Sequence, residues 1–591
     1  MFDRGKSAAA MYNNVKKKQP EKLFSRNIKE VLTMFNVTFS DGSALAFSSP
    51  VSGEEVLRAR GLENAPVPVV AWHVDHLLRP LNWVIDGDAK VDWVDLSTPE
   101  GMAVYQSSLG FLLCIAARRV LNRSLRVNNS ISEGLFWVME AASGDPIVAE
   151  GEEISEEAVA ALKKEMQRMI DADLPFTVEV TSIDKACRWF NAHGRPGKAA
   201  LLACAMSEQP VELSVCDGEK DMYYTPLVAR TGYLRMFELS RLAPGVVLRF
   251  PTTQSPRELP PFRPSAKLQK VFLDYAEWMR KFRILTMVQI WDEVARDGGR
   301  ELILMSEALH AQQIAHIAED FLSVPTRRVI TIAGPSASGK TTTSHKLRIQ
   351  LQVHGRRPIA ISLDDFFVDR DKCPLDEDGK QDFEALEAID LELFDRRMAE
   401  LLAGETVRLP KFDFYSGKSV QGAELKLEPD DVLIVEGLHG LNDRIAGAIP
   451  RECRYGIFLS PLTGINLDKH TRTSTTDHRL LRRMLRDART RGYSPERTLL
   501  RWPSVVRGGM KWIFPYQHNA DALFNSSLLY ELPVMRVYAE SLLRAIDEES
   551  PVRGEAMRLM RLLRSVPVID PDMVPSNSLL REFIGGSIIE I

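Results

Sequence analysis

The stretch that most restricts the fold of this chain is residues 329–343, VITIAGPSASGKTTT. A short apolar run leads into Gly334, and after four positions come Gly339, Lys340 and Thr341, followed by polar residues that can begin a helix. Glycine at these two positions lets the backbone turn so that several N–H groups converge on the same phosphate oxygens. The pattern therefore predicts a strand, a phosphate-binding loop and a helix whose N-terminus adds the positive end of its dipole.

Individual side chains of this loop have predicted roles in binding ATP and Mg²⁺. Lys340 supplies a point charge for the β- and γ-phosphates, and Thr341 offers a hydroxyl group to Mg²⁺. The alternative is a chance match, since turns rich in glycine and serine are common, but the flanking strand and helix are the context that the motif requires. The predicted nucleotide-binding residues of the loop are Gly334, Pro335, Ser336, Ala337, Ser338, Gly339, Lys340, Thr341 and Thr342.

Length and composition restrict the class of protein. A chain of 591 residues is too long for one core and predicts about three domains. A formal net charge of −5 gives no global reason to expect nucleic acid or an anionic membrane as partner, and no apolar run approaches the length of a membrane span. The six cysteines form no CxxC pair, which is typical of a reducing compartment and leads us to expect a cytoplasmic protein. Residues 1–30 are polar and basic, and we interpret them as a mobile, solvated tail rather than a transit peptide.

The N-terminal part predicts two small mixed domains. Alternating runs around Asp41 and Gly42 predict a hairpin, followed by a helix candidate, SGEEVLRARGL, and the strand candidates VPVVAWHV and VDWVDL. The order over residues 31–96 resembles the TGS domain, a β-grasp module of threonyl-tRNA synthetases and certain GTPases. Residues 97–250 resemble the second N-terminal domain of threonyl-tRNA synthetase, through PEGMAVYQSSLGFLLCIAARRV, ISEGLFWVME and DMYYTPLVARTGYLRMFELSRLAPGVVLRF.

The positions that would carry editing chemistry in this second domain are altered. In the synthetase family, a His-x-x-x-His pair and a Cys-x-x-x-His pair remove wrongly attached serine. The matching positions here are Ser107, Phe111, Tyr223 and Leu227. Because phenylalanine and leucine can neither ligate a metal nor relay a proton, hydrolytic editing is not expected. We interpret this half as a scaffold or regulatory part rather than an RNA-binding one, since basic and aromatic residues are not densely interleaved in it.

Residues 251–591 predict a linker, a helical connector and an α/β domain. Proline density marks residues 251–265 as a semi-rigid linker, and apolar residues at helical spacing predict helices over 266–325. From residue 326 onward, strands alternate with helices, which predicts a parallel sheet wrapped by helices. The predicted strands are residues 329–333, 358–363, 432–435 and 455–459, with 534–538 as a further candidate.

Two acidic residues follow predicted strands of this sheet. Asp364 comes directly after the run 359–363, where a carboxylate can accept the proton of a hydroxyl group that attacks a γ-phosphoryl group. The alternative for Asp364 is a helix cap. Glu436 follows an apolar strand in DVLIVEG and can hold the hydration shell of Mg²⁺; its alternative is a buried structural glutamate.

A one-sided basic helix completes the predicted site. In HRLLRRMLRDARTRG, the residues Arg479, Arg482, Arg483 and Arg486 follow i, i+3, i+4, i+7 spacing. Charge runs are usually solvated surface, but a face this one-sided is repulsive without an anion nearby, and guanidinium groups stabilise transferring phosphoryl groups. We interpret the segment as a mobile lid in which Arg479, Arg482 and Arg486 bind nucleotide and Arg482, with Lys340 and Asp364, is catalytic.

The motifs GPSASGKTT, SLDDFF, PKFDFYSGKS, VLIVEG, RLLRRMLRD and HNADALFN resemble, in order and spacing, the uridine kinase and phosphoribulokinase family. The resemblance implies that Asp364 is the general base for a sugar hydroxyl group and that Glu436 is the Mg²⁺-associated acid. DFEALEAID is similar to the family's DFDHPDAFD, which implies that Glu384 contacts ribose hydroxyl groups. The aromatic residues implied to line the substrate pocket are Phe383, Phe412 and Phe414.

Departures from the family pattern concern the acceptor. The histidine with which uridine kinases read the pyrimidine is replaced by Gly417, and the DHPD core is replaced by residues 384–387, EALE. The leading hypothesis is therefore an ATP- and Mg²⁺-dependent kinase that phosphorylates a small sugar-containing acceptor, a nucleoside above others. The alternatives are a nucleotide-controlled switch associated with RNA or translation, against which no NKxD guanine-reading motif occurs, and a small-molecule sensor coupled to kinase output.

Overall fold

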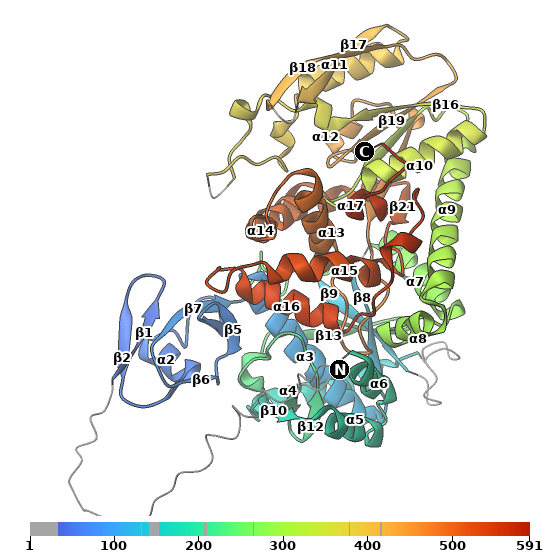
Figure 1. Cartoon of the computed structure of the whole chain (residues 1–591). Coiled ribbons are helices and arrows are strands. Elements are labelled where there is room, and N and C mark those ends of the chain that lie inside the picture. Colours follow the sequence, from blue (N-terminus) through green and yellow to red (C-terminus); the bar gives the residue numbers. More distant parts are fainter. Residues whose placement is uncertain are drawn as a thin grey trace, which may run out of the picture.

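The computed structural model describes residues 34–131, 133–140, 153–205, 210–263, 265–376, 379–413 and 416–590. The predicted tail at residues 1–30 lies outside the described residues. In Figure 1, a small blue module lies at one side, a second mixed domain lies below, and the parallel sheet with strands β16 and β19 lies at the top. The long helix α9, Arg300–Leu322, runs along one side of the molecule between the two larger parts.

The blue module is a five-stranded mixed sheet crossed by one helix. Its strand order is β2-β1-β7-β4-β5, in which β1 and β7 are parallel. The predicted hairpin around Asp41 and Gly42 is confirmed, because β1 and β2 pair antiparallel and Gly42 has a φ of +80°. The core of the module surrounds Trp72, which is fully buried. The elements are β1 Phe35–Phe39, β2 Ala44–Phe47, β3 Val51–Ser52, α2 Gly53–Ala59, β4 Val69–Val74, β5 Leu77–Pro80, β6 Val84–Ile85 and β7 Ala89–Asp95.

The second domain is built around helix α3, Pro99–Leu121. Thr98 caps this helix by accepting a hydrogen bond from the Gly101 amide. Contrary to the expectation from the sequence, α3 is long and apolar enough to cross a membrane, but 78% of its apolar window is buried inside the protein. It therefore serves as the core helix of this domain. The other elements are β8 Leu125–Ile131, β9 Gly134–Met139, α4 Glu156–Asp171, β10 Thr177–Thr181, α5 Ile183–Ala192, α6 Pro196–Ala205, β11 Val211–Cys216, β12 Glu219–Asp221, β13 Glu238–Leu242 and β14 Gly245–Arg249.

Helices follow the proline-rich stretch, as the apolar spacing predicts. They are α7 Ala266–Lys281, α8 Met287–Asp297 and α9. Phe272, Tyr275 and Met279 of α7 lie one helical turn apart and are buried. The last turns of α9 pack Ile314, Ala318 and Phe321 against the face of the parallel sheet, so this connector is part of the core beneath the phosphate-binding loop.

The C-terminal part contains a five-stranded sheet of order β16-β19-β15-β20-β21, in which every neighbouring pair is parallel. The predicted strands at 329–333, 358–363, 432–435 and 455–459 are confirmed. The prediction of a strand at 534–538 is wrong, because these residues belong to a helix that buries Val534 and Met535 and leaves Val537 exposed, and the fifth strand is β21. The elements are β15 Val329–Ala333, α10 Lys340–Val353, β16 Arg357–Ser362, α11 Leu391–Leu402, β17 Val407–Asp413, β18 Lys418–Leu425, β19 Asp431–Gly437, α12 Asp443–Ala446, β20 Arg454–Ser460, α13 Thr475–Thr490, α14 Pro495–Trp512, β21 Ala522–Asn525, α15 Glu531–Arg544, α16 Arg553–Arg564 and α17 Arg581–Ile584.

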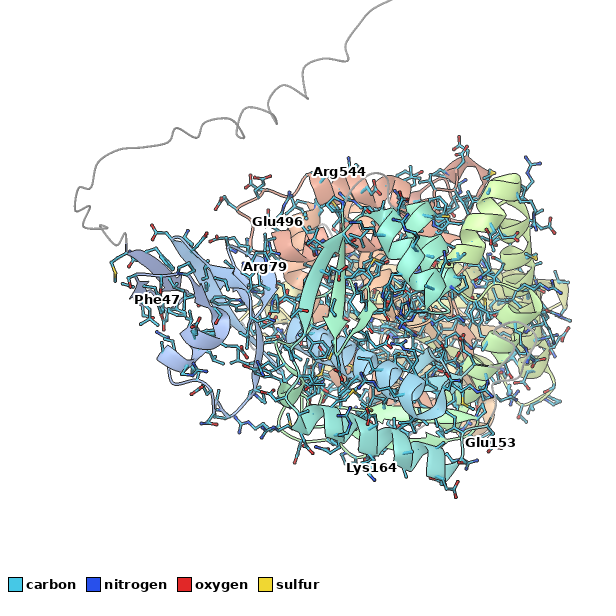
Figure 2. The ribbon with its side chains drawn as sticks, turned by 90° about the horizontal axis from the view of Figure 1, so that it is seen from below. Phe47, Arg79, Glu153, Lys164, Glu496 and Arg544 are labelled. Atoms are coloured by element: carbon cyan, nitrogen blue, oxygen red, sulfur yellow. The ribbon has the colours of Figure 1, made fainter. Side chains whose placement is uncertain are left out.

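The synthetase-like domain is docked on the loop at residues 461–474, which leads from β20 into α13. The Val127 amide of β8 donates to the Lys469 carbonyl at 3.0 Å, and Asn466 Nδ2 donates to the Val127 carbonyl at 2.7 Å. Beside these bonds, Lys198 Nζ lies 2.9 Å from Asp468 Oδ2. The β-grasp module is attached elsewhere, where β5 contacts one of the C-terminal helices, residues 553–564; Figure 2 shows Arg79 of β5 on the side that faces these helices.

Candidate nucleotide-binding and phosphoryl-transfer site

The phosphate-binding loop connects β15 to α10 and is buried from Gly334 to Gly339. A Cβ atom on Gly334 would lie 2.2 Å from the Leu459 carbonyl oxygen of the neighbouring strand β20. Only glycine fits there, because that neighbour is backbone that cannot move aside. Ala337 and Gly339 have φ values of +61° and +89°, so the loop makes the turn that brings successive amides to one side.

Lys340 lies at the start of α10 beside three carboxyl groups. Its Nζ donates to the Gly334 carbonyl at 2.9 Å. Burial lowers the pKa of the ammonium group, while the charges of Glu436, Asp364 and Glu384 act in the opposite direction. These three acids come from three separate segments, so the fold gathers at Lys340 the residues that the sequence analysis placed in the transfer site.

Asp364 and Glu436 lie at the carboxyl ends of the adjacent parallel strands β16 and β19, where Ser362 pairs with Glu436. The Ser362 hydroxyl donates to Glu436 Oε1 at 3.1 Å and accepts a bond from the Asp364 amide at 3.3 Å. Burial raises the pKa of Asp364, and burial together with the charge of Asp364 raises the pKa of Glu436 to about 7. Two desolvated carboxyl groups therefore lie beside a single ammonium group, so a further cation bound there would be stabilised by the excess negative charge.

That donor set fits Mg²⁺ in the presence of a nucleotide. Mg²⁺ retains several waters and is usually held by one or two carboxylates together with phosphate oxygens. The exposed Thr341 hydroxyl and Glu436 are the residues that could hold it. The described residues contain no group of three or more histidine, cysteine, aspartate or glutamate side chains that could hold a metal ion. Mg²⁺ at this site would therefore need the phosphate oxygens of the nucleotide as further ligands.

Arg482 contacts the carbonyl side of the phosphate-binding loop. Its guanidinium group is fully buried, and Nη1 lies 3.3 and 3.2 Å from the carbonyls of Ala337 and Ser338. Nη2 donates to the Ser526 carbonyl at 2.7 Å and to Glu531 Oε1 at 2.5 Å. The sequence predicts a direct contact between Arg482 and phosphate. To make it, the Arg482 guanidinium group would have to give up some of these hydrogen bonds to the protein.

The remaining lid arginines also have protein partners. Arg479 Nε donates to the Ser336 carbonyl at 3.0 Å, and Arg483 Nη1 donates to Ser336 Oγ at 2.7 Å. Arg486 lies 3.6 Å from Glu582, and its Nε is buried without a hydrogen-bond partner among the described residues. Burial lowers the pKa values of Arg479 and Arg486 to about 10, so both are charged at neutral pH. Arg479 Nη2 and Arg482 Nε are likewise buried without a hydrogen-bond partner among the described residues, so each of the three arginines predicted to bind nucleotide has a guanidinium nitrogen still to be satisfied.

The C-terminal segment packs against the loop, a feature that the sequence analysis missed. Thr342 Oγ1 donates to Glu582 Oε2 at 2.8 Å, and Arg489 Nη2 donates to the Glu582 carbonyl at 2.8 Å. A Cβ atom on Gly339 would lie 2.8 Å from the Leu579 side chain. The segment SLLREFIGG carries no local motif that announces this contact, which only the tertiary fold creates.

The predicted acceptor residues lie beside the acids. The side chain of Glu384 is partly buried, and this burial raises its pKa despite the nearby Arg483, Lys340 and Arg479. Phe383 and Phe412 belong to the apolar cluster under this segment, and the Phe412 ring packs edge-on against Phe367 with centroids 5.6 Å apart. Phe414 lies outside the described residues.

Gly417, at the position of the family's base-reading histidine, is covered by another side chain. A Cβ atom there would lie 2.8 Å from Arg370 Nε, and Gly417 has a φ of +70°. A histidine would therefore be strained in backbone and would displace Arg370. The structure thus gives a physical reason for this departure from the family pattern.

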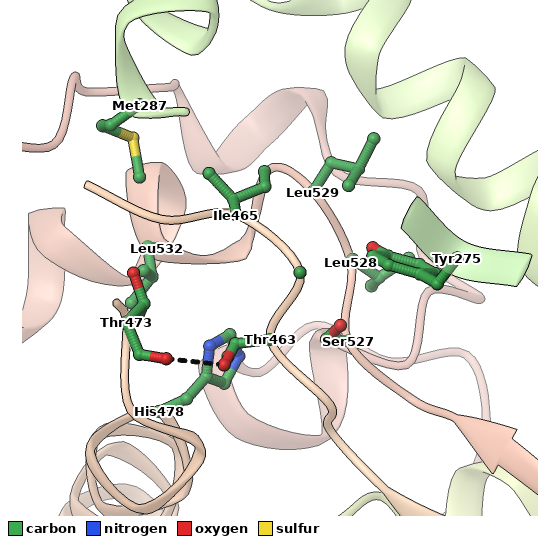
Figure 3. A pocket seen from close by; sticks show the side chains of 11 residues that line it. Tyr275, Met287, Thr463, Ile465, Thr473, His478, Ser527, Leu528, Leu529 and Leu532 are labelled. Carbon is green, nitrogen blue, oxygen red and sulfur yellow. Dashed lines mark hydrogen bonds between the residues drawn. The ribbon is translucent and has the colours of Figure 1, made fainter. Parts of the chain in front are cut away.

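A cavity elsewhere in the domain is too small for an acceptor. It lies between α7, the loop at 461–474 and the start of α15, and Figure 3 shows Thr473, His478 and Tyr275 pointing toward it. Its volume is about 20 Å³, which accommodates one water molecule.

The altered editing positions lie in the core of the second domain. Phe111 is fully buried, its ring centroid lies 5.6 Å from that of Tyr223, and Leu227 is buried beside them. Ser107 Oγ is 3.2 Å from Thr225 Oγ1. The four positions therefore form packing contacts and one hydroxyl pair, which offer no ligand set for a metal.

The parallel sheet, the glycine-rich loop and the gathered acids define the C-terminal part as a P-loop kinase. Residues 329–528 match the model of the phosphoribulokinase / uridine kinase family, and this chain belongs to that family. A uridine kinase from Ligilactobacillus salivarius is 30% identical over 196 residues, which cover 33% of this chain and 83% of that protein. A structure described as a possible uridine kinase from Bacillus stearothermophilus is 22% identical to this chain. The match covers 25% of this chain and 79% of the other protein's chain, with a TM-score of 0.22.

The N-terminal half has relatives of a different kind. A threonine–tRNA ligase from Aromatoleum aromaticum is 26% identical over 283 residues, which cover 48% of this chain and 41% of the ligase. This confirms the predicted architecture, a synthetase-like N-terminal half joined to a kinase domain. The chain spans about two fifths of the ligase, so the ligase's activity does not carry over to it.

Proposed function

We propose that this chain transfers the γ-phosphoryl group of ATP to a hydroxyl group of a small sugar-containing acceptor, a nucleoside above other candidates. The observation that carries the proposal is the placement of Asp364 and Lys340 together at the carboxyl edge of the sheet, where each influences the pKa of the other. One group binds the phosphate to be transferred, and the other accepts the proton that the acceptor must lose.

Each residue has a defined part in this reaction. The loop amides and the Lys340 ammonium group bind the β- and γ-phosphates and orient the γ-phosphorus toward the acceptor. The acceptor oxygen forms a bond to the γ-phosphorus, the bond from that phosphorus to the β–γ bridging oxygen breaks, and the hydroxyl proton passes to the Asp364 carboxylate. The raised pKa of Asp364 makes it a better proton acceptor than an exposed aspartate.

Charge in the transition state is balanced by groups around the loop. Thr341 and Glu436 would hold Mg²⁺, which when bound supplies positive charge against the phosphate oxygens. Arg486 can turn from Glu582 toward the phosphates and exclude water from the site.

The direct test incubates the purified full chain with ATP, Mg²⁺ and a panel of nucleosides and sugars, and measures labelled product. Lys340→Ala should lower turnover by at least about 100-fold, since it removes a preorganised phosphate-binding charge. Lys346→Ala, on the same helix, is the matched control and should retain activity, because Lys346 pairs with Glu307 instead. No transfer to any acceptor by the wild-type chain would refute the proposal.

A second candidate is a nucleotide-controlled regulatory protein associated with RNA or translation. It is favoured by the docking of the synthetase-like domain on the loop before α13, because a change at that interface can be passed to the arginines that hold the phosphate-binding loop. Cofractionation with tRNA or ribosomes that is lost at high salt would support this candidate. Absence of cofractionation at low salt, together with acceptor phosphorylation, would exclude it.

A further inference from the structure

We propose that Glu582 competes with the phosphates of a bound nucleotide for the side chain of Arg486 and thereby weakens nucleotide binding. This inference rests on the proposed function, because it assigns a positioning residue to the nucleotide side of the same site. Glu582 belongs to the segment 529–591, which lies beyond residues 329–528 that match the family model. The proposed competition is therefore a property of the part of this chain that follows the family domain.

Glu582 is a buried carboxylate beside the first turn of α10. It lies on α17, next to α13 and α10 (Figure 1), and it is only 3% exposed. Thr342 Oγ1 donates to its Oε2 at 2.8 Å, and Thr342 follows Lys340 by two residues in the first turn of α10. Negative charge is stabilised at the first turn of a helix, which is also where a phosphate-binding loop holds its phosphates. The protein thus supplies an anion of its own beside the expected phosphate site.

Arg486 is held less tightly than the neighbouring lid arginines. Arg479 and Arg482 bond carbonyl oxygens of the phosphate-binding loop at 3.0 to 3.3 Å. Arg486 Nη1 instead lies 3.6 Å from Glu582 Oε1, which is longer than a hydrogen bond, and its buried Nε has no hydrogen-bond partner in the described part of the chain. Arg486 can therefore exchange Glu582 for a phosphate oxygen without breaking a bond to the loop.

Both members of this pair lie within electrostatic range of the transfer site. Burial raises the pKa of Asp364, and nearby cations, Lys340 first and Arg486 among the others, act in the opposite direction. Burial and the charge of Asp364 raise the pKa of Glu436 to about 7, and the Glu582 carboxylate acts in the same direction. Arg486 is therefore close enough to attract nucleotide phosphates, and Glu582 is close enough to oppose their binding.

The packing of α17 allows this exchange to occur through the side chains alone. A largely buried guanidinium group needs a counter-charge, which Glu582 supplies to Arg486 until a nucleotide brings phosphates. Leu580 and Phe583 of the same segment are fully buried, and Arg489 Nη2 donates to the Glu582 carbonyl at 2.8 Å. These contacts do not depend on the Glu582 carboxylate, so α17 can stay packed while Arg486 changes partner.

The test removes the charge of Glu582 and measures nucleotide binding. Glu582→Gln keeps a side-chain oxygen that can accept the Thr342 hydrogen bond. The purified full chain is titrated with the non-hydrolysable analogue β,γ-imido-ATP at a fixed Mg²⁺ concentration, and the dissociation constant is measured by calorimetry. Glu582→Gln should lower this constant by about 3- to 10-fold, because Arg486 is then free to bind phosphate. A purely structural role of Glu582 predicts weaker binding instead.

Two further variants show whether the gain acts through Arg486. In an Arg486→Gln background, Glu582→Gln should change the dissociation constant by less than about 2-fold, since the shared arginine is absent. Asp572→Asn is the matched control, because it removes the same charge from an exposed position in the same segment. It should also change nucleotide binding by less than about 2-fold, because solvent and salt screen an exposed charge.

The outcomes distinguish this inference from the proposed function. If the wild-type chain does not bind the analogue, both fail. If it binds, but Glu582→Gln binds equally or more weakly, or gains as much in the Arg486→Gln background, the proposed function stands and the competition is refuted. Should Glu582→Gln fail to fold, hydrogen exchange of the wild type decides. The amides of α17 should exchange faster with the analogue bound, because Glu582 has lost its ionic partner, and unchanged or slower exchange would refute the competition.

Discussion

Arg482 and Glu531 form a fully buried ion pair, with 2.5 Å between Nη2 and Oε1, against the phosphate-binding loop. Glu531 also contacts His478; burial raises the pKa of the Glu531 carboxyl group, but Arg482 and His478 outweigh burial and lower it. Because Arg482 bonds the carbonyls of Ala337 and Ser338 as well, the pair fixes the shape of the loop.

Removing one partner of this pair should therefore lower the free energy of unfolding of the domain. Glu531→Ala leaves the Arg482 charge buried without its counter-ion, and we expect a loss of roughly 3–5 kcal/mol in the free energy of unfolding. Glu540→Ala, on the same helix α15, breaks a partly exposed pair with Arg536 and should cost less than about 1 kcal/mol. Urea unfolding measures the free energy of unfolding of both variants. Equal losses in the two variants would contradict a larger contribution to stability from the buried pair.

The closeness of α14 to Glu384 leads to a prediction about acceptor binding. A Cβ atom on Gly508 would lie 2.6 Å from the Glu384 Cβ, whereas one on the neighbouring Gly509 would meet only ordinary contact, 3.5 Å from the Phe514 ring. Gly508→Ala should displace Glu384 and raise the acceptor KM by ~10- to 100-fold, with little change in the KM for ATP. Gly509→Ala is the control, since it makes the same gain in helix propensity. Steady-state kinetics in which both variants match the wild type would contradict the placement of Glu384 at the acceptor.

The C-terminal segment gives a third prediction. Thr342→Val keeps the shape of the side chain but removes the hydrogen bond to the buried Glu582 carboxylate, which should cost roughly 1–3 kcal/mol of stability. Thr490→Val, at an exposed threonine, should change stability by less than about 0.5 kcal/mol. Thermal unfolding checks both, and an unchanged Thr342→Val midpoint would show that α17 does not stabilise the loop.

The sequence predicts four of the five parallel strands because each is a short apolar run, and three of these runs lead directly into Gly334, Asp364 or Glu436. The same rule fails at residues 534–538, since a short run with four apolar residues around Arg536 is also compatible with a helix, and here Val534, Met535 and Ala539 face the core from α15. Length alone cannot separate the two cases.

The site is predictable where residues are close in sequence and unpredictable where they meet through the fold. The loop and Asp364 carry local motifs, whereas Glu582 lies 240 residues from Thr342, and Gly508 reaches Glu384 only through the packing of α14. The one-sided arginine face correctly indicates a need for anions. Its partners here are carbonyl oxygens and Glu531, which lies 49 residues beyond Arg482 and has no motif of its own.

The last prediction concerns pH and the interface between the two halves. His470 Nδ1 lies 2.6 Å from Asp221 Oδ2. Burial disfavours the imidazolium ion, but the Cys114 sulfur and the Asp221 carboxylate outweigh burial and raise the pKa of His470 to about 9.

Because this pKa is raised, the contribution of protonated His470 to the free energy of unfolding is complete below about pH 6.5 and is lost as the pH rises toward 9. The free energy of unfolding should thus fall by roughly 1–3 kcal/mol over that range in the wild type and stay nearly level in His470→Gln, while the exposed His193→Gln control should follow the wild type. Neighbouring Asp221 and Lys198 do not titrate there, because the ion pair lowers the pKa of Asp221 and raises that of Lys198. Parallel pH profiles for the wild type and His470→Gln, measured by urea unfolding at each pH, would refute a protonated His470 at the interface.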